Sequence, residues 1–160
     1  MMQQVLIGCG SSMGIPELNI RMARSLLSVL EETQLVKQSQ LYRSTPLGKA
    51  TALFINQCCV IETNLTPQAL LRSIQDIECT VGRRRSQRWM DRIIDIDILL
   101  YGDQIIEHDT LKIPHQELLY RSFVLQPACE IAGSWLHPIY KTPLNDFRIP
   151  KPRSWKFALF

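Results

Sequence analysis

Residues 82–101, GRRRSQRWMDRIIDIDILLY, join a basic segment to an apolar one. Isoleucine at every second position from 94 to 98 is typical of a β-strand, in which successive side chains point to opposite faces. Four apolar side chains are therefore expected on one face: Ile94, Ile96, Ile98 and Leu100. Asp95 and Asp97 would share the other face, about 6–7 Å apart along the strand. Two such carboxylates repel each other and are costly to bury without a partner.

A divalent cation would resolve this repulsion. Mg²⁺ in proteins binds one or two carboxylates and keeps phosphates and waters as its other ligands. Five arginines, whose guanidinium groups suit phosphate oxygens, precede the strand: Arg83, Arg84, Arg85, Arg88 and Arg92. The segment therefore favours a site for magnesium and a polyphosphate. Two alternatives stay open from these residues alone. The arginines could form an ordinary solvated surface, and both aspartates could be plain salt-bridge partners of Arg88 and Arg92.

The composition is that of one globular domain spanning residues 1–160. Hydrophobic residues make up 46% and charged residues 21% of the chain, as in ordinary globular proteins. The net charge of +3 is mild, so a nucleic-acid footprint over the whole surface is not indicated. Five cysteines without a C-x-x-C pair indicate reduced thiols rather than zinc ligands. Because a signal pattern and an apolar run of about 18 residues are both lacking, we expect a cytoplasmic protein without membrane association.

Apolar periodicity predicts three strands and two helices before residue 82. The strands are expected at residues 4–10, 35–44 and 52–63. One helix is expected over residues 17–33, where apolar residues at helical spacing follow Pro16. Thr66 followed by Pro67 is a favoured start for the other helix, in which Gln75 and Glu78 are expected on the more polar side.

With the aspartate-bearing strand, the order of elements becomes β-α-β-β-α-β. This order predicts an α+β fold of the ferredoxin-like kind, an antiparallel sheet with helices packed on one face. It would bring the turn at Gly10 near Asp95 and Asp97. Three further pieces are expected after the core: strand or hairpin structure at 104–113, a short helix at 123–132 and an irregular tail at 137–160, where prolines oppose regular structure.

Taken together, these residues resemble the 6-hydroxymethyl-7,8-dihydropterin pyrophosphokinases, which transfer diphosphate from ATP to a pterin alcohol in folate biosynthesis. The resemblance covers about residues 4–132. Its most specific part is the pattern R-W-x-x-R-x-x-D-x-D, formed here by Arg88, Trp89, Arg92, Asp95 and Asp97. The other matching positions are Gly10-Ser11, Tyr42-Arg43, Pro46-Leu47-Gly48, Asn56, Gln75 with Glu78, Gly82-Arg83-x-Arg85, Pro114-His115, and Arg121 with Phe123.

The resemblance implies a set of roles around ATP and the pterin, with two Mg²⁺ ions held by Asp95 and Asp97. The residues implied in catalysis are Arg83, Arg85, Arg92, Asp95 and Asp97. Those implied in ATP binding are Gln75, Glu78, Arg85, Arg92, Ile98, Leu111, His115 and Arg121. Those implied in pterin binding are Ser44, Thr45, Pro46, Leu47, Asn56, Trp89 and Phe123. None of these side chains is an obvious strong base, which favours metal-assisted deprotonation of the pterin hydroxyl.

The chain departs from the family pattern in the spacing from Arg85 to Arg88, which is one residue tighter than in some relatives, and in the residue type at three positions. Ser12 replaces an asparagine, Thr45 a frequent proline and Gln116 a frequent aromatic residue. None of these changes removes a metal ligand. Tyr42 is expected to be structural, and His108 and His137 are expected to be surface or packing residues.

Two other functions were weighed against a pyrophosphokinase. A nucleic-acid-binding module could use basic and aromatic residues on a ferredoxin-like sheet, but carboxylates on one of the strands do not suit it. Another two-metal nucleotidyl or phosphotransfer enzyme could carry the same paired acids, but Pro46, Asn56 and Phe123 argue against it. We therefore expect a monomer that binds ATP and 6-hydroxymethyl-7,8-dihydropterin, and neither nucleic acid nor membranes.

Overall fold

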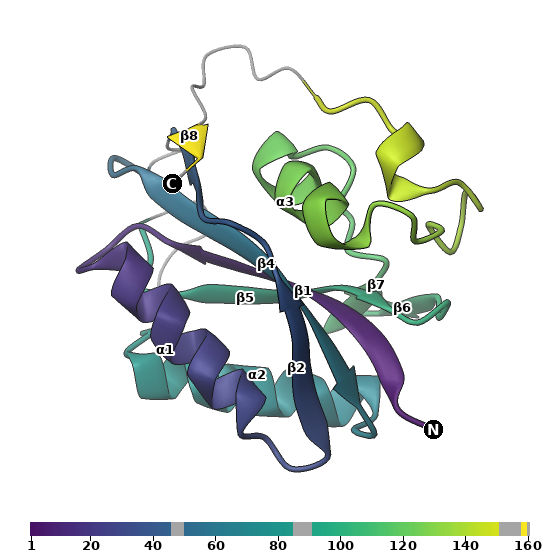
Figure 1. Ribbon diagram of the computed structural model, residues 1–160. Helices are drawn as coiled ribbons and strands as arrows, with labels where there is room; N and C mark the ends of the chain where they lie inside the picture. Colours follow the sequence, from purple (N-terminus) through teal and green to yellow (C-terminus); the bar gives the residue numbers. More distant parts are fainter. Residues whose placement is uncertain (46–49, 85–90, 151–157, 160) are drawn as a thin grey trace.

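A computed structural model describes residues 1–45, 50–84, 91–150 and 158–159 of the chain (Figure 1). The strands are β1 (Gln3–Ser11), β2 (Thr33–Gln38), β3 (Tyr42–Ser44), β4 (Phe54–Thr63), β5 (Asp95–Tyr101), β6 (Ile106–His108), β7 (Leu111–Ile113) and β8 (Ala158–Leu159). The helices are α1 (Pro16–Ser28), α2 (Pro67–Val81), α3 (Ser122–Ala132) and the short 3-10 helix η1 (Leu144–Asp146). This order confirms the predicted α+β fold, including the hairpin β6–β7 and the short helix α3.

The strands of the main sheet pair antiparallel in the order β5-β1-β4-β3-β8, and β2 also pairs with β4. The expected strand at 35–44 is therefore two strands, which lie one after the other along the edge of β4. Pairing of β2 with β4 ends where Gln38 lies opposite Cys59, and pairing of β3 with β4 begins where Tyr42 lies opposite Asn56. Between them Ser39 uses its hydroxyl to accept a hydrogen bond from the Cys58 amide at 3.0 Å, in place of a ladder carbonyl.

Two hydrophobic cores lie on opposite faces of the sheet. Helices α1 and α2 cover one face and α3 covers part of the other (Figure 1). Alternate residues of β1 divide between the cores, since Ile7 packs towards α1 and α2 while Leu6 packs in the core that includes α3. Cys59 and Cys58 divide in the same way, as expected for neighbours in a strand. The prediction of helices on one face is therefore right for α1 and α2, and α3 covers part of the other face.

Strand β5 contains a β-bulge that the sequence pattern did not predict. Leu6 pairs with Leu100, but the next residue, Ile7, pairs with Ile98, so Leu99 is the extra residue. Leu99 and Leu100 both pack in the core of α3, whereas Ile98 packs towards α1 and α2. The expectation that Leu100 shares a face with the isoleucines is therefore wrong, because the bulge reverses the alternation between them.

Two segments differ from the predicted boundaries. Helix α1 ends at Ser28 rather than near residue 33, because the chain turns at Glu32, which has a positive φ of 53°, and Thr33 already begins β2. The segment after residue 137 is not merely draped on the surface. Leu144 is fully buried against α3, and its amide donates to the Trp135 carbonyl at 2.9 Å.

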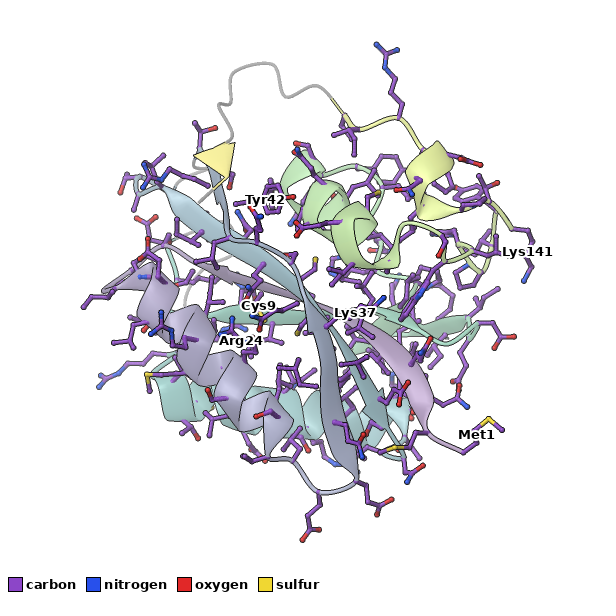
Figure 2. All side chains as sticks on the ribbon, viewed as in Figure 1. Met1, Cys9, Arg24, Lys37, Tyr42 and Lys141 are labelled. Atoms are coloured by element: carbon purple, nitrogen blue, oxygen red, sulfur yellow. The ribbon has the colours of Figure 1, made fainter. Side chains whose placement is uncertain are left out.

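Several residues expected to be structural are confirmed in that role. The hydroxyl of Tyr42, labelled in Figure 2, donates to Glu130 Oε2 of α3 at 2.7 Å and so joins β3 to α3. His137 is buried and packs against the rings of Tyr140 and Phe147. Across the described ranges, none of the helices has both the length and the apolar character that a membrane crossing requires.

Candidate active site

Two glycines of β1 form the floor of the site. Gly10 lies between Asp95 of β5 and Asn56 of β4. Gly8 lies between Asp97 of β5 and Cys58 of β4. Residues directly opposite one another in a sheet point to the same face. A Cβ on Gly10 would lie 3.2 Å from Asn56 Oδ1, so a side chain there would crowd this amide and fill part of the row. The floor therefore presents carboxylates at one edge and an amide at the other, with bare backbone between them.

An open cavity of about 1100 Å³ lies above this floor. Every expected site residue that falls in the described ranges lines it: Ser44, Thr45, Asn56, Gln75, Glu78, Arg83, Arg92, Asp95, Asp97, Ile98, Leu111, His115, Arg121 and Phe123. The other expected site residues lie outside the described residues: Pro46, Leu47, Arg85 and Trp89. The fold thus brings residues from β3, β4, α2, β5, β7 and α3 to one place, although they are spread over some eighty positions of sequence.

The two aspartates have different surroundings. Asp95 Oδ1 accepts hydrogen bonds from Arg83 at 3.0 Å and from Arg92 at 3.1 Å. The salt-bridge alternative is therefore found for Asp95, with Arg92 and Arg83 as partners, while Arg88 lies outside the described residues. Asp97 faces His115 instead, with 3.7 Å between Oδ1 and Nε2. Burial, the Asp95 carboxylate and then Glu78 raise the pKa of Asp97 to about 7. The negative charge at this edge is thus only partly balanced by the protein.

The bulge in β5 positions His115. The carbonyl of Leu99 accepts a hydrogen bond from the His115 amide at 2.9 Å, which places the imidazole beside Asp97. Burial and then the charge of Arg121 lower the pKa of His115, so the ring is neutral at neutral pH. Its Nδ1 accepts from the Glu117 amide at 3.2 Å, which leaves the proton on Nε2. His115 therefore offers the cavity a neutral N–H donor.

Glu78 is buried beneath the arginines rather than on a polar side of α2, where the helical pattern had placed it. Its Oε1 accepts from the Ile96 amide at 2.7 Å and forms an ion pair with Arg83. Gly82, with a left-handed φ of 119°, ends α2 and turns the chain so that Arg83 can reach back to Glu78. Burial raises the pKa of Glu78, although its contacts with Ile96 and Arg83 oppose the rise. Glu78 thus ties the start of β5 to the first arginine of the basic segment.

The opposite side of the cavity combines an amide, hydroxyls and an aromatic ring. Asn56 Nδ2 donates to Ser44 Oγ at 2.8 Å, which fixes the amide with its oxygen near Gly10. Within the described part of the chain, the buried hydroxyl of Thr45 has no hydrogen-bond partner. Phe123 stands at the start of α3, with the Arg121 guanidinium 5.9 Å from its ring centre. This side suits a flat heterocycle whose edge carries donors and acceptors.

Comparison with known proteins decides the family. Residues 6–133 match the model of the 7,8-dihydro-6-hydroxymethylpterin-pyrophosphokinase (HPPK) family. The chain belongs to the HPPK family. Transfer of the pyrophosphoryl group of ATP to hydroxymethyldihydropterin, a step of folate biosynthesis, is therefore its activity.

Curated relatives support the HPPK assignment along most of the chain. The 2-amino-4-hydroxy-6-hydroxymethyldihydropteridine pyrophosphokinase of Pseudomonas aeruginosa is 41% identical over 133 residues, which cover 82% of each chain. The pyrophosphokinase of the same name from Aquifex aeolicus is 38% identical over 149 residues, 92% of this chain and 91% of that one.

Solved structures support the HPPK fold. A crystal structure of HPPK-DHPS in complex with substrates has a TM-score of 0.71 at 13% identity, and covers 92% of this chain and 43% of that one. Wild-type Plasmodium falciparum HPPK-DHPS with pterin and p-hydroxybenzoate has a TM-score of 0.69 at 14% identity, with 91% and 42% covered. The chain spans less than half of these longer proteins, and at such identity the likeness concerns the fold alone.

Sequence reasoning missed two residues of this HPPK chain. Gly8 could have been found, because a second glycine two positions before Gly10 in an apolar strand marks a bare face. Asp91 could not, because its hydrogen-bond partners Ser12 and Thr51 lie 79 and 40 residues away in sequence. The departure at Ser12 also gains an explanation, since its hydroxyl accepts from the Arg92 amide at 3.0 Å.

Proposed function

We propose that Asp95 and Asp97 bind two Mg²⁺ ions that hold the phosphates of ATP at the glycine floor. The observation that carries this proposal is the pair of carboxylates at the edge of one cavity, with cations around them and an aromatic pocket opposite. Over the described residues, no three His, Cys, Asp or Glu side chains cluster as metal ligands. Two carboxylates with phosphates and waters completing the shell are what Mg²⁺ requires, so the residues fit. Bound there, the ions would neutralise phosphate charge and align the attacking and leaving oxygens.

The cations of the cavity are proposed to bind the triphosphate. Arg83 and Arg92 hold Asp95 in the structure, and their guanidinium groups can exchange this carboxylate for phosphate oxygens of similar geometry. His115 would donate a hydrogen bond from its Nε2–H to a phosphate oxygen. Arg121 and, by the resemblance, Arg85 would complete the set. The adenine side is assigned to Gln75, Ile98 and Leu111. Glu78 would contribute to ATP binding chiefly by holding Arg83.

The pterin is proposed to lie between Phe123 and the amide of Asn56. Stacking of a heterocyclic base on an aromatic side chain is worth about 1–3 kcal/mol. Phe123→Ala is therefore expected to raise the KM for the pterin about 5- to 150-fold, with a much smaller change in the KM for ATP. Phe147→Ala is the matched control, because its ring packs against His137 and Tyr140. Equal pterin KM values in both variants would contradict the assignment of Phe123 to the pterin pocket.

Thermal stability with added ligands tests the proposed site as a whole. Mg²⁺ with a non-hydrolysable ATP analogue should raise the Tm, and the pterin alcohol should raise it further, because ligands that bind only the folded state stabilise it. Nucleosides in place of the pterin should add nothing. The double variant Asp95→Asn with Asp97→Asn should lose the response that depends on Mg²⁺. A double variant that responds as the unaltered protein does would refute the metal assignment.

A further inference from the structure

Asp91 joins segments of the chain that are distant in sequence. Its carboxylate accepts three hydrogen bonds from the start of the segment that leads into β4: from the Thr51 amide at 3.2 Å, the Thr51 hydroxyl at 2.9 Å and the Ala52 amide at 3.1 Å. A fourth comes from the Ser12 hydroxyl at 3.4 Å. Desolvation raises the pKa of Asp91, but these hydrogen bonds outweigh it and the pKa is lowered, so the group is ionised.

Ser12 also contacts Arg92, the residue that follows Asp91, and so joins Arg92 to the segments that Asp91 holds together. The Arg92 amide donates to Ser12 Oγ at 3.0 Å, and the Arg92 carbonyl accepts from the amides of Ser12 and Met13 at 2.9 and 3.2 Å. The Ser11 hydroxyl donates to the Ile93 carbonyl. The end of β1, residues 51–52 and residues 91–93 are therefore held together, with Asp91 as the charged centre.

Asp91 lies beside the cavity without lining it. Ala50, one residue before Thr51, and Arg92, one residue after Asp91, both line the cavity, whereas Asp91 is absent from its lining. Displacement of either segment would move groups that face the substrates. A misplacement of about 1 Å can cost about 10²-fold in rate.

We propose that Asp91 is a positioning residue of the pyrophosphoryl transfer, which fixes Arg92 and the segment at Ala50 relative to the glycine floor. The proposal rests on the proposed function, in which Arg92 binds the phosphates. Nothing in the family resemblance assigns a role to this position. A negative charge suits it, since the donors that meet there include two backbone N–H groups and two hydroxyls, and only a carboxylate offers enough acceptor sites for all of them.

Asp91→Ala and Asp91→Asn test the proposal, with Thr63→Val as the control for lost stability. Thr63 is fully buried at the far end of β4, where its hydroxyl bonds Thr33 and the Leu65 amide. At a temperature well below each Tm and with both substrates saturating, Asp91→Ala should lower kcat about 10- to 100-fold. Asp91→Asn, which keeps one acceptor oxygen, should lose less. Thr63→Val should keep kcat within about twofold despite a Tm lower by about 2–4 °C.

Amide hydrogen exchange provides a readout independent of catalysis. The Thr51 and Ala52 amides should be protected in the unaltered protein and should exchange at least about tenfold faster in the Asp91 variants, as hydrogen-bonded amides do when they are released. If Asp91→Ala does not fold, Asp91→Asn tests the proposal by the same two measurements, kcat and amide exchange. A kcat within twofold of the unaltered protein, or a loss no greater than that of Thr63→Val, would overturn the proposal. Failure of the proposed function would instead appear as an unchanged kcat and an unchanged KM for ATP in Arg92→Ala, while both amides remain protected in the unaltered protein.

Discussion

Asp97→Asn is expected to lower kcat about 10³-fold or more, while the metal-free variant unfolds at a higher temperature than the unaltered protein at pH 8. On the proposed metal assignment, activity falls because an amide is a poor Mg²⁺ ligand and the substitution removes half of the paired charge at the cavity edge. The kcat is measured as AMP formation from ATP and the pterin alcohol. Asp103→Asn, an exposed position beyond the other end of β5, makes the same change in charge and should leave kcat unaltered.

The expected gain in stability follows from the sign of the pKa shift. Burial and the Asp95 carboxylate raise the pKa of Asp97 from 3.8 to about 7. The metal-free protein therefore loses stability as the pH rises from about 4 through about 7, because the folded state must give up a proton that it holds more tightly. Asparagine does not titrate and avoids this cost.

Solvent screening reduces the size of this gain. Because the Asp97 side chain is 43% exposed, only about 1 kcal/mol of the shift should appear as stability. That corresponds to a rise in Tm of about 2–4 °C for a chain of this size, measured at pH 8 with a chelator present. A Tm at or below that of the unaltered protein would contradict the raised pKa.

Glu78→Ala is expected to give the largest loss of stability, about 3 kcal/mol, because it breaks a buried ion pair and leaves a buried backbone N–H without an acceptor. The variant would leave Arg83 with Asp95 as its remaining partner and the Ile96 amide without an acceptor. A loss of this size corresponds to a fall in Tm of about 6–12 °C. Glu78→Gln should lose much less, since the amide oxygen can still accept from Ile96.

Activity should fall in Glu78→Ala as well, for a geometric reason. Ile96 lies between Asp95 and Asp97, so release of its amide frees the strand at the point where both carboxylates must be held in place. Asp76→Ala is the matched control on the same helix, because Asp76 is exposed. If Glu78→Ala and Asp76→Ala unfold at the same temperature, the contact between Glu78 and Ile96 does not stabilise the fold.

The order of the core elements and the direction of the two aspartates could be predicted because they depend on local patterns. Alternation over 93–98 gave the direction of both aspartates, and the Thr66-Pro67 start of α2 is seen, with the Thr66 hydroxyl accepting from the Ala69 amide at 3.2 Å. The family motif then selected residues that lie far apart in sequence, such as Ser44 and Phe123. Physical patterns alone would not have joined them, because each such residue is more often structural.

What could not be predicted depends on contacts between distant segments. Leu99 continues the apolar run of β5 and carries no mark of a bulge, which arises only from pairing with β1. Glu78 follows the polar side of the helical pattern, yet Arg83 and the Ile96 amide draw it inward. Leu144 stands alone among prolines, and only the surface of α3 explains its burial.

The single extra residue in β5 also has a consequence for which sequence changes the chain can tolerate. Loss of Leu99 would restore regular pairing, because Leu100 would still pair with Leu6 and Ile98 with Ile7, and both acidic groups would keep facing the cavity. The change would instead remove the carbonyl that holds the His115 amide, together with one side chain of the core beside α3. Loss of Ile96, by contrast, would put Asp95 opposite Cys9 and turn its carboxylate towards the helices. The strand can therefore lose its bulge without turning its acidic groups over, but it cannot lose a residue from the regular pairing between them.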